Sequence, residues 1–163
     1  MTAKTMRLTV AALAACTLVA AHAAPARAQT NRTHVGLNVV YNFDYEEFGA
    51  GGQMTFPIGQ MLQFYPSFNV YFVDGGSLWA ANADLKYAVS GENLNWLYLG
   101  GGLNVTTASA GGGSDSNAGL NLFAGVESLR GNVHPFLEVR FTVGDGSSGQ
   151  VAAGLNFTLG RHQ

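Results

Sequence analysis

Apolar and polar side chains alternate along most of the chain from residue 33 onward. Leu37 and Val39, for example, alternate with Gly36 and Asn38. A period of two places alternate side chains on opposite faces of a β-strand. Turn-forming residues separate eight such segments, which span about 33–43, 48–58, 62–72, 78–89, 97–106, 118–127, 133–143 and 150–159. The pattern therefore predicts an all-β protein of eight strands.

One face of every predicted strand is apolar along its whole length. From Val35 onward, no position on this face carries a charge, an amide or an aliphatic hydroxyl group. Segments of roughly 10 residues with this alternation are typical of strands that cross a membrane. The sequence therefore predicts an eight-stranded antiparallel up-and-down transmembrane β-barrel.

The apolar face is expected to point outward, towards lipid. The interior of an eight-stranded barrel is just wide enough for side chains to fill it, and the opposite face is rich in Gly, Asn and Gln. Charged residues make up only 11% of the chain, whereas a water-facing exterior carries many Lys and Glu residues. The alternative is a soluble, exported, lipocalin-like barrel that turns its apolar face inward and binds an apolar ligand.

The first residues have the features of a secretory signal peptide. Lys4 and Arg7 precede an apolar stretch at 8–21, and the small residues Ala26 and Ala28 flank a cleavage site. We expect residues 1–28 to be removed and residues 29–163 to form the barrel domain. Cleavage after Ala24 remains open, as does lipoprotein-type processing at Cys16, the only cysteine.

Aromatic residues of the apolar face fall near the ends of the predicted strands. Outer-membrane barrels carry aromatic girdles at both membrane interfaces. One rim is predicted to contain Tyr41, Phe43, Phe48, Phe72, Trp79 and Phe141, and the other Phe56, Phe64, Tyr87 and Phe157.

The connections are expected to alternate between the two sides of the membrane. Periplasmic turns are predicted at 59–61, 90–95 and 128–132, and extracellular loops at 44–47, 73–77, 107–115 and 144–149. The glycine-rich tract at 111–116 is expected to be a flexible loop. Pro66 lies in mid-strand, where proline removes a hydrogen bond of the ladder, so we expect a bulge or a strand break there.

Four charged residues lie on the predicted inner face near mid-depth: Asp84, Lys86, Glu138 and Arg140. Buried charges need partners, so these residues are predicted to form a lumenal ion-pair network, with a proton or ion path as the functional alternative. Several aromatic residues are also expected to crowd the interior and to leave no open pore. They are Tyr65, Tyr71, Trp96, Tyr98, Phe123 and Phe136.

Catalytic residues, metals and cofactors are not expected. Neither His34 nor His134 is followed by serine at the spacing used by barrel enzymes that deacylate lipid A. A lipid-modifying enzyme without a sharp motif stays open as an alternative. His134 with Glu138 could ligate a metal, and the acidic stretch 44–47 could hold a divalent cation, but a hydrogen-bonded histidine and a solvated loop explain them better. The net charge of −2 gives no basic surface for nucleic acid.

The end of the chain carries a further pattern. Gly154, Phe157 and Leu159 follow the order Gly-x-x-apolar-x-apolar. With the strand count and alternation, this resembles the small eight-stranded outer-membrane barrels of the OmpA transmembrane-domain and OmpX type. Two features depart from that family: Ala152 stands where a polar residue is usual, and residues 160–163 follow the last apolar position.

The resemblance implies where the protein resides and what it contacts. It implies export to the outer membrane, insertion by the barrel-assembly machinery with residues 154–159 as the signal, contact with lipid and lipopolysaccharide, and a monomeric state. The expected role is structural or in surface interaction, without an open pore.

Overall fold

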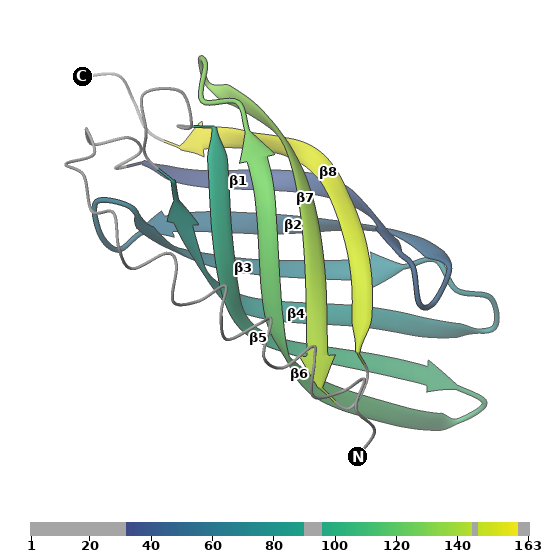
Figure 1. Cartoon of the computed structure of the whole chain (residues 1–163). Coiled ribbons are helices and arrows are strands. Elements are labelled where there is room, and N and C mark those ends of the chain that lie inside the picture. The colour runs from purple at the N-terminus through teal and green to yellow at the C-terminus, as the bar shows by residue number, and fades with distance from the viewer. Residues whose placement is uncertain (1–31, 90–95, 145–146, 160–163) are drawn as a thin grey trace.

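The computed structural model describes residues 32–89, 96–144 and 147–159. They form eight strands: β1 (Thr33–Asn42), β2 (Glu47–Pro57), β3 (Leu62–Tyr71), β4 (Gly76–Ala88), β5 (Leu97–Ala110), β6 (Gly113–Glu127), β7 (Val133–Gly144) and β8 (Ser148–Leu159). Each strand pairs antiparallel with the next, and β8 pairs with β1, so the sheet closes on itself (Figure 1). The predicted eight-stranded up-and-down barrel is confirmed. Within the described residues, no helix is long and apolar enough to cross a membrane.

The two faces of the wall differ as the alternation predicts. On β1, Leu37 is 68% exposed on the outside, whereas His34 and Asn42 point into the barrel and are almost completely buried. The same alternation runs along β7, where Val139 is exposed and its neighbour Arg140 is buried. The apolar face is therefore the outer face, and the polar face lines the lumen. The predicted signal peptide (residues 1–28) lies outside the described residues.

The expectation of a flexible loop at 111–116 is wrong. β5 and β6 continue almost to the tip of their hairpin and pair up to Ala110 and Gly113. Gly111 and Gly112 have φ angles of 59° and 86°, and two successive positive φ angles are those of the tight type I′ hairpin turn. These glycines therefore close a two-residue turn, while residues 114–116 belong to β6.

The expectation of a bulge or break at Pro66 is also wrong. β3 runs unbroken through this residue, and Pro66 pairs with Ala83 of β4. On the β2 side, pairing proceeds to Gln53 opposite Ser67 and resumes in the same register at Phe56 opposite Phe64. The strands therefore tolerate the missing N–H of proline without inserting a residue.

Trp96 does not lie in the lumen as expected. It precedes the first residue of β5 in a turn and is 45% exposed. Its carbonyl oxygen accepts a hydrogen bond of 2.7 Å from the Glu127 N–H. The alternation of faces does not apply to a residue outside the strand. The other predicted interior aromatics are buried, namely Tyr65, Tyr71, Tyr98, Phe123 and Phe136.

Candidate functional site

Of the residues that the structure describes, five with charged side chains lie buried in the lumen. They are Asp84 and Lys86 on β4, Glu127 at the end of β6, and Glu138 and Arg140 on β7. Each lies on the inward face of its strand because of the two-residue alternation. These residues and the amides around them are the most chemically distinctive group in the described part of the chain.

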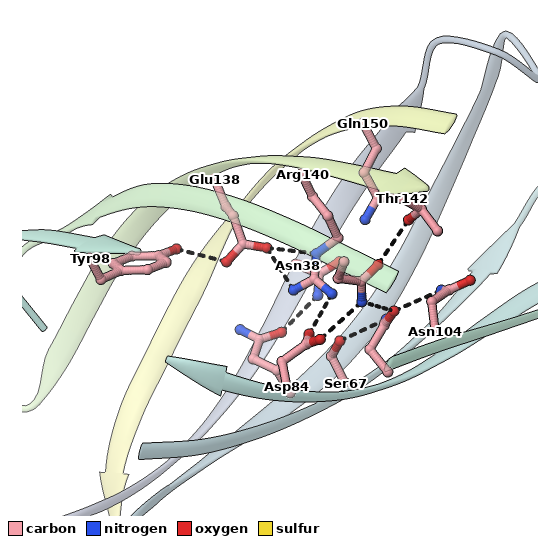
Figure 2. Close-up of polar contacts among 12 residues, drawn as sticks. Asn38, Ser67, Asp84, Tyr98, Asn104, Glu138, Arg140, Thr142 and Gln150 are labelled. Atoms are coloured by element: carbon pink, nitrogen blue, oxygen red, sulfur yellow. Dashed lines mark hydrogen bonds and ion pairs between the residues drawn. The ribbon is translucent and has the colours of Figure 1, made fainter. Parts of the chain in front are cut away.

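Arg140 joins two carboxylates from opposite parts of the wall (Figure 2). Its Nη1 lies 2.5 Å from Oδ2 of Asp84, and its Nη2 and Nε lie 2.9 and 3.1 Å from Oε1 of Glu138. The guanidinium group packs against the ring of Phe123, with Arg140 Cζ 4.6 Å from the ring centroid. A guanidinium fork suits two acceptors held in fixed directions, so the arrangement ties β7 to β4 across the lumen.

Lys86 pairs with Glu127 rather than with the other members of the predicted network. Its Nζ lies 2.5 Å from Oε2 of Glu127, and 4.0 and 5.2 Å from the ring centroids of Tyr98 and Tyr65. Tyr98 also donates a hydrogen bond of 3.0 Å from its hydroxyl to Oε2 of Glu138. The charged residues thus form two clusters, one around Arg140 and one around Lys86, with Tyr98 between them.

The predicted ion-pair network did not include Glu127. Its acidic side chain and its inward position on β6 were visible in the sequence. Its contact with Lys86 depends on how far strands two places apart are shifted along each other, which alternation alone does not reveal. Asp84, Glu138 and Arg140 are brought together as expected, and a bracing role for the clusters stays a prediction.

A row of hydrogen-bonded amide side chains starts at the Lys86 cluster. Oε1 of Glu127 accepts from Asn156 Nδ2 (2.7 Å), Asn156 Oδ1 accepts from Gln53 Nε2 (2.8 Å), and Gln53 Oε1 accepts from Asn38 Nδ2 (2.7 Å). A carboxylate only accepts hydrogen bonds, so Asn156 must turn its NH₂ group towards Glu127 and its oxygen towards Gln53. The same rule then orients Gln53 and Asn38. The row ends at Asn38 Oδ1, a buried acceptor without a donor among the described residues.

A second set of amides surrounds the Arg140 cluster. Asn121 Nδ2 donates to Asp84 Oδ1 and Asn82 Oδ1 at 2.9 and 2.8 Å, and Asn121 Oδ1 accepts from Thr142 Oγ1 at 2.8 Å. Asn104 Nδ2 also donates to Asn82 Oδ1 at 2.8 Å. These bonds connect strands from β4 to β7, so the polar side chains of the lumen form a connected network.

Beyond these amides the lumen becomes apolar. Val40, Tyr71, Leu78 and Ala80 pack together inside the barrel near the connections at 43–46 and 72–75. The Tyr71 hydroxyl donates to Gln150 Oε1 at 2.6 Å. This end of the lumen is therefore occupied by packed side chains.

The opposite end contains the two described histidines. The rings of His34 and His134 meet edge to face with their centroids 5.0 Å apart. His134 Nδ1 lies 2.8 Å from the Ser128 carbonyl oxygen, and Nε2 lies 2.9 Å from Thr158 Oγ1. Both ring nitrogens of His134 are thus occupied. Among the residues with described positions, no three His, Cys, Asp or Glu side chains form a group able to hold a metal ion.

The outward aromatics form contacts near both rims. Near one, Tyr41 lies 5.3 Å from Phe43 and 4.8 Å from Phe48 between ring centroids; near the other, Phe56 stacks on Phe64 at 6.4 Å. The remaining members of the predicted girdle also occupy outward positions: Phe72, Trp79, Tyr87, Phe141 and Phe157. Their contact with a membrane interface stays a prediction.

The predicted assembly signal lies on β8. Phe157 and Leu159 are exposed on the outer face. Gly154 faces inward, where a Cβ atom would lie 2.2 Å from the Leu37 carbonyl oxygen and 2.7 Å from the Phe136 ring. Packing alone therefore requires glycine at this position, and its recognition by assembly machinery stays a prediction.

These observations define a class of structure: a closed eight-stranded antiparallel barrel with an apolar outer face and a packed, charged lumen. Solved proteins of this class are similar in structure to the chain. The N-terminal β-barrel domain of Pseudomonas aeruginosa OprF is 15% identical with a TM-score of 0.67, over 80% of this chain and 98% of that one. Neisserial surface protein A (NspA) is 18% identical with a TM-score of 0.60, over 78% and 97% of the two chains.

The attachment invasion locus protein Ail of Yersinia pestis is 15% identical with a TM-score of 0.50, over 78% of this chain and 97% of that one. No protein-family profile matches the sequence. No curated protein matches it either. The predicted resemblance to the small eight-stranded outer-membrane barrels is confirmed at the level of the fold.

Proposed function

We propose that this protein is a monomeric outer-membrane β-barrel with a structural or surface-interaction role and no open pore. The observation that carries the proposal is the combination of a continuous apolar outer face with a lumen packed by paired charges. The membrane location, the contacts with lipid and lipopolysaccharide, and insertion by the barrel-assembly machinery are parts of this proposal.

The outer face supports a membrane location over the soluble alternative. Large apolar side chains are exposed on every strand, among them Leu37, Phe68 and Leu103. Soluble monomers rarely expose contiguous apolar patches larger than a few hundred Å². A lipocalin-like barrel would also need an apolar lumen, whereas this one holds five buried charges. A barrel in hydrocarbon accounts for both observations, because lipid contacts the apolar outer face while the wall encloses the charged side chains.

The outer face also indicates where hydrocarbon ends. On β5 and β6 the outward positions change from Val105 and Ala118 to Thr107 and Ser116, whose hydroxyl oxygens lie 2.9 Å apart; Ser116 is exposed and Thr107 is buried. The same hydroxyl character continues to the tip, where Ser109 donates to Ser114 at 3.1 Å. The tip of the hairpin is therefore suited to water. We assign this end of the barrel to the cell exterior because the predicted alternation of the connections places the one at 107–115 outside.

The lumen supports a closed barrel over a channel. Arg140 and Lys86 are each held by carboxylates and aromatic rings. Beyond them, Val40, Tyr71 and Leu78 pack across one end. Water or ions could cross only after these contacts separate, so a steady open state is not expected.

Three measurements test the proposal. The mature protein should require detergent for extraction and should migrate differently on a gel before and after boiling. Purified protein in planar bilayers should show no stable large conductance, with an open porin as the positive control. Lipid A should keep its mass when the protein is expressed. A freely soluble folded monomer would contradict the membrane location. A stable porin-like conductance would contradict the closed lumen, and a change in the mass of lipid A would contradict a non-enzymatic role.

A further inference from the structure

β6 is longer than its neighbour β7 at the end assigned to the exterior. Pairing between β5 and β6 continues to Ala110 opposite Gly113, but pairing between β6 and β7 begins only at Gly119 opposite Gly144. Among the residues that the structure describes, 113–118 of β6 thus pair only with β5, and Figure 1 shows the hairpin extending past the end of β7. A closed barrel has no sheet edge within its wall. Residues 113–118 extend beyond the part of the wall where β6 pairs with β7, so they form an open sheet edge.

The backbone groups on this edge can be identified from the alternation of the ladder. The Glu127 N–H donates to Trp96 on the β5 side, whereas the Ser128 N–H donates to Pro135 on the β7 side. Successive residues of a strand direct their hydrogen-bonding groups to opposite sides. Ser114 and Ser116 differ from Ser128 by an even number of residues, so their N–H and C=O groups also point away from β5. They point into the space beyond the last residue of β7.

Asp115 is the one charged residue on this edge, which lacks the other common protections against strand addition. Exposed edges are commonly blocked by Lys, by Pro or by a bulge, and residues 113–118 include neither Lys nor Pro. Their pairing with β5 is regular in every position. The hydroxyl contacts of Ser114 with Ser109 and of Ser116 with Thr107 hold the hairpin in its extended form. The edge is therefore preorganised to accept another strand.

The charge of this end indicates what kind of strand fits. Its described charged residues are all acidic: Asp44, Glu46, Glu47, Asp74 and Asp115. The described basic residues lie elsewhere, with Lys86 and Arg140 buried in the lumen and Arg32 and Arg130 at the opposite end. A second copy of this chain would bring like charges together, whereas a basic segment would be attracted.

We propose that residues 113–118 of β6 bind an extended, basic segment of a partner polypeptide, which adds to the sheet as a further strand. Backbone hydrogen bonds to Ser114 and Ser116 would supply the affinity, and the acidic residues around the rim would select Lys or Arg side chains. The inference rests on the proposed function in one respect only, because a partner outside the cell can reach this edge only if this end faces the exterior.

The binding test uses purified, folded protein in detergent and three fluorescent peptides. The first alternates Lys with Thr. The second has the same sequence with its backbone N-methylated at alternate residues, and the third replaces Lys by Glu. We expect the first peptide to bind with an affinity that falls as salt rises. The N-methylated and the Glu peptides should bind about tenfold more weakly or not at all, because one lacks backbone donors and the other has the wrong charge.

Protein variants locate the binding site. Ser116→Pro removes an edge N–H that no described residue uses, so it should weaken binding of the Lys–Thr peptide about tenfold. Ser116→Thr is the matched control, because it keeps both the backbone N–H and a hydroxyl group opposite Thr107, and it should bind like the wild type. The gel shift on boiling reports folding of each variant. If Ser116→Pro does not fold, Ser114→Pro nearer the tip takes its place, and the N-methylated peptide tests the same hydrogen bonds on the wild-type protein.

Several results would overturn the inference. Equal binding of the plain and N-methylated peptides would mean attraction by charge alone. Unchanged binding by a folded proline variant would place the peptide elsewhere. Concentration-dependent dimers that Ser116→Pro abolishes would identify a second copy as the occupant. An epitope inserted between Gly111 and Gly112 tests the exterior assignment separately, since its inaccessibility on intact cells would contradict the orientation without changing peptide binding in detergent.

Discussion

The outer and inner faces of this barrel are built from the same strands but follow different rules. On β2, Gly52 faces outward and its neighbour Gly51 faces inward. A Cβ atom at Gly52 would have its nearest contact at 3.4 Å, whereas one at Gly51 would lie 2.0 Å from Asn69 Oδ1 and 2.2 Å from a backbone oxygen. The outward position at Gly52 needs only apolar character and has room. Inward positions have specific partners and almost no spare space.

The comparison shows where the identity of a residue matters. Any apolar side chain satisfies hydrocarbon to a similar degree, so the outer face tolerates exchange among apolar types. In the lumen each polar group must find a partner, because an unpaired buried charge or hydrogen-bonding group is costly. The following variants test this contrast.

Arg140→Met should have the largest effect. The substitution leaves Asp84 and Glu138 buried without their cation, and breaking a buried ion pair from one side costs about 3–5 kcal/mol. Urea-induced unfolding in lipid vesicles, followed by tryptophan fluorescence, measures the loss. The matched control combines Arg140→Met with Asp84→Asn and Glu138→Gln, and should regain most of the stability. A fully stable single variant would show that the cluster does not brace the barrel.

Leu122→Arg should have the next largest effect, on the opposite face. Leu122 is outward on β6, and an Arg side chain near the bilayer midplane destabilises a membrane barrel by about 2–4 kcal/mol. The same unfolding measurement applies, with Leu122→Val as the apolar control. Equal stability of the Arg and Val variants would mean that this face does not contact hydrocarbon.

Gly51→Ala and Gly52→Ala should differ by the smallest amount. The methyl group at Gly51 meets Asn69 and the backbone of β3, and overpacking of this kind costs about 1–3 kcal/mol. Gly52→Ala should remain within about 0.5 kcal/mol of the wild type. Both glycines lie on one strand, so the pair compares the faces directly. A larger loss at Gly52 would reverse the contrast.

The two faces were also not equally predictable from the sequence. Alternation is a local property, so it correctly predicted the strands, the closed barrel and the direction of Leu37 and Arg140. Partners across the lumen depend on the shift between distant strands, which explains why the Lys86–Glu127 pair was not foreseen. Trp96 was misplaced because it lies in the turn before the strand, where the alternation of faces does not apply. The Gly-rich tip was misjudged because Gly111 and Gly112 serve a tight turn.

The row of amides from Glu127 through Asn156 and Gln53 to Asn38 has a consequence for biogenesis. Asn156 belongs to β8, the last strand to be synthesised, yet it links groups on β6 and β2. Until β8 zips onto β1, Glu127 lacks its amide donor and Gln53 lacks its acceptor. A partly zipped sheet would therefore hold unsatisfied polar groups at the seam. Closure should consequently be cooperative, with half-finished barrels short-lived in the bilayer.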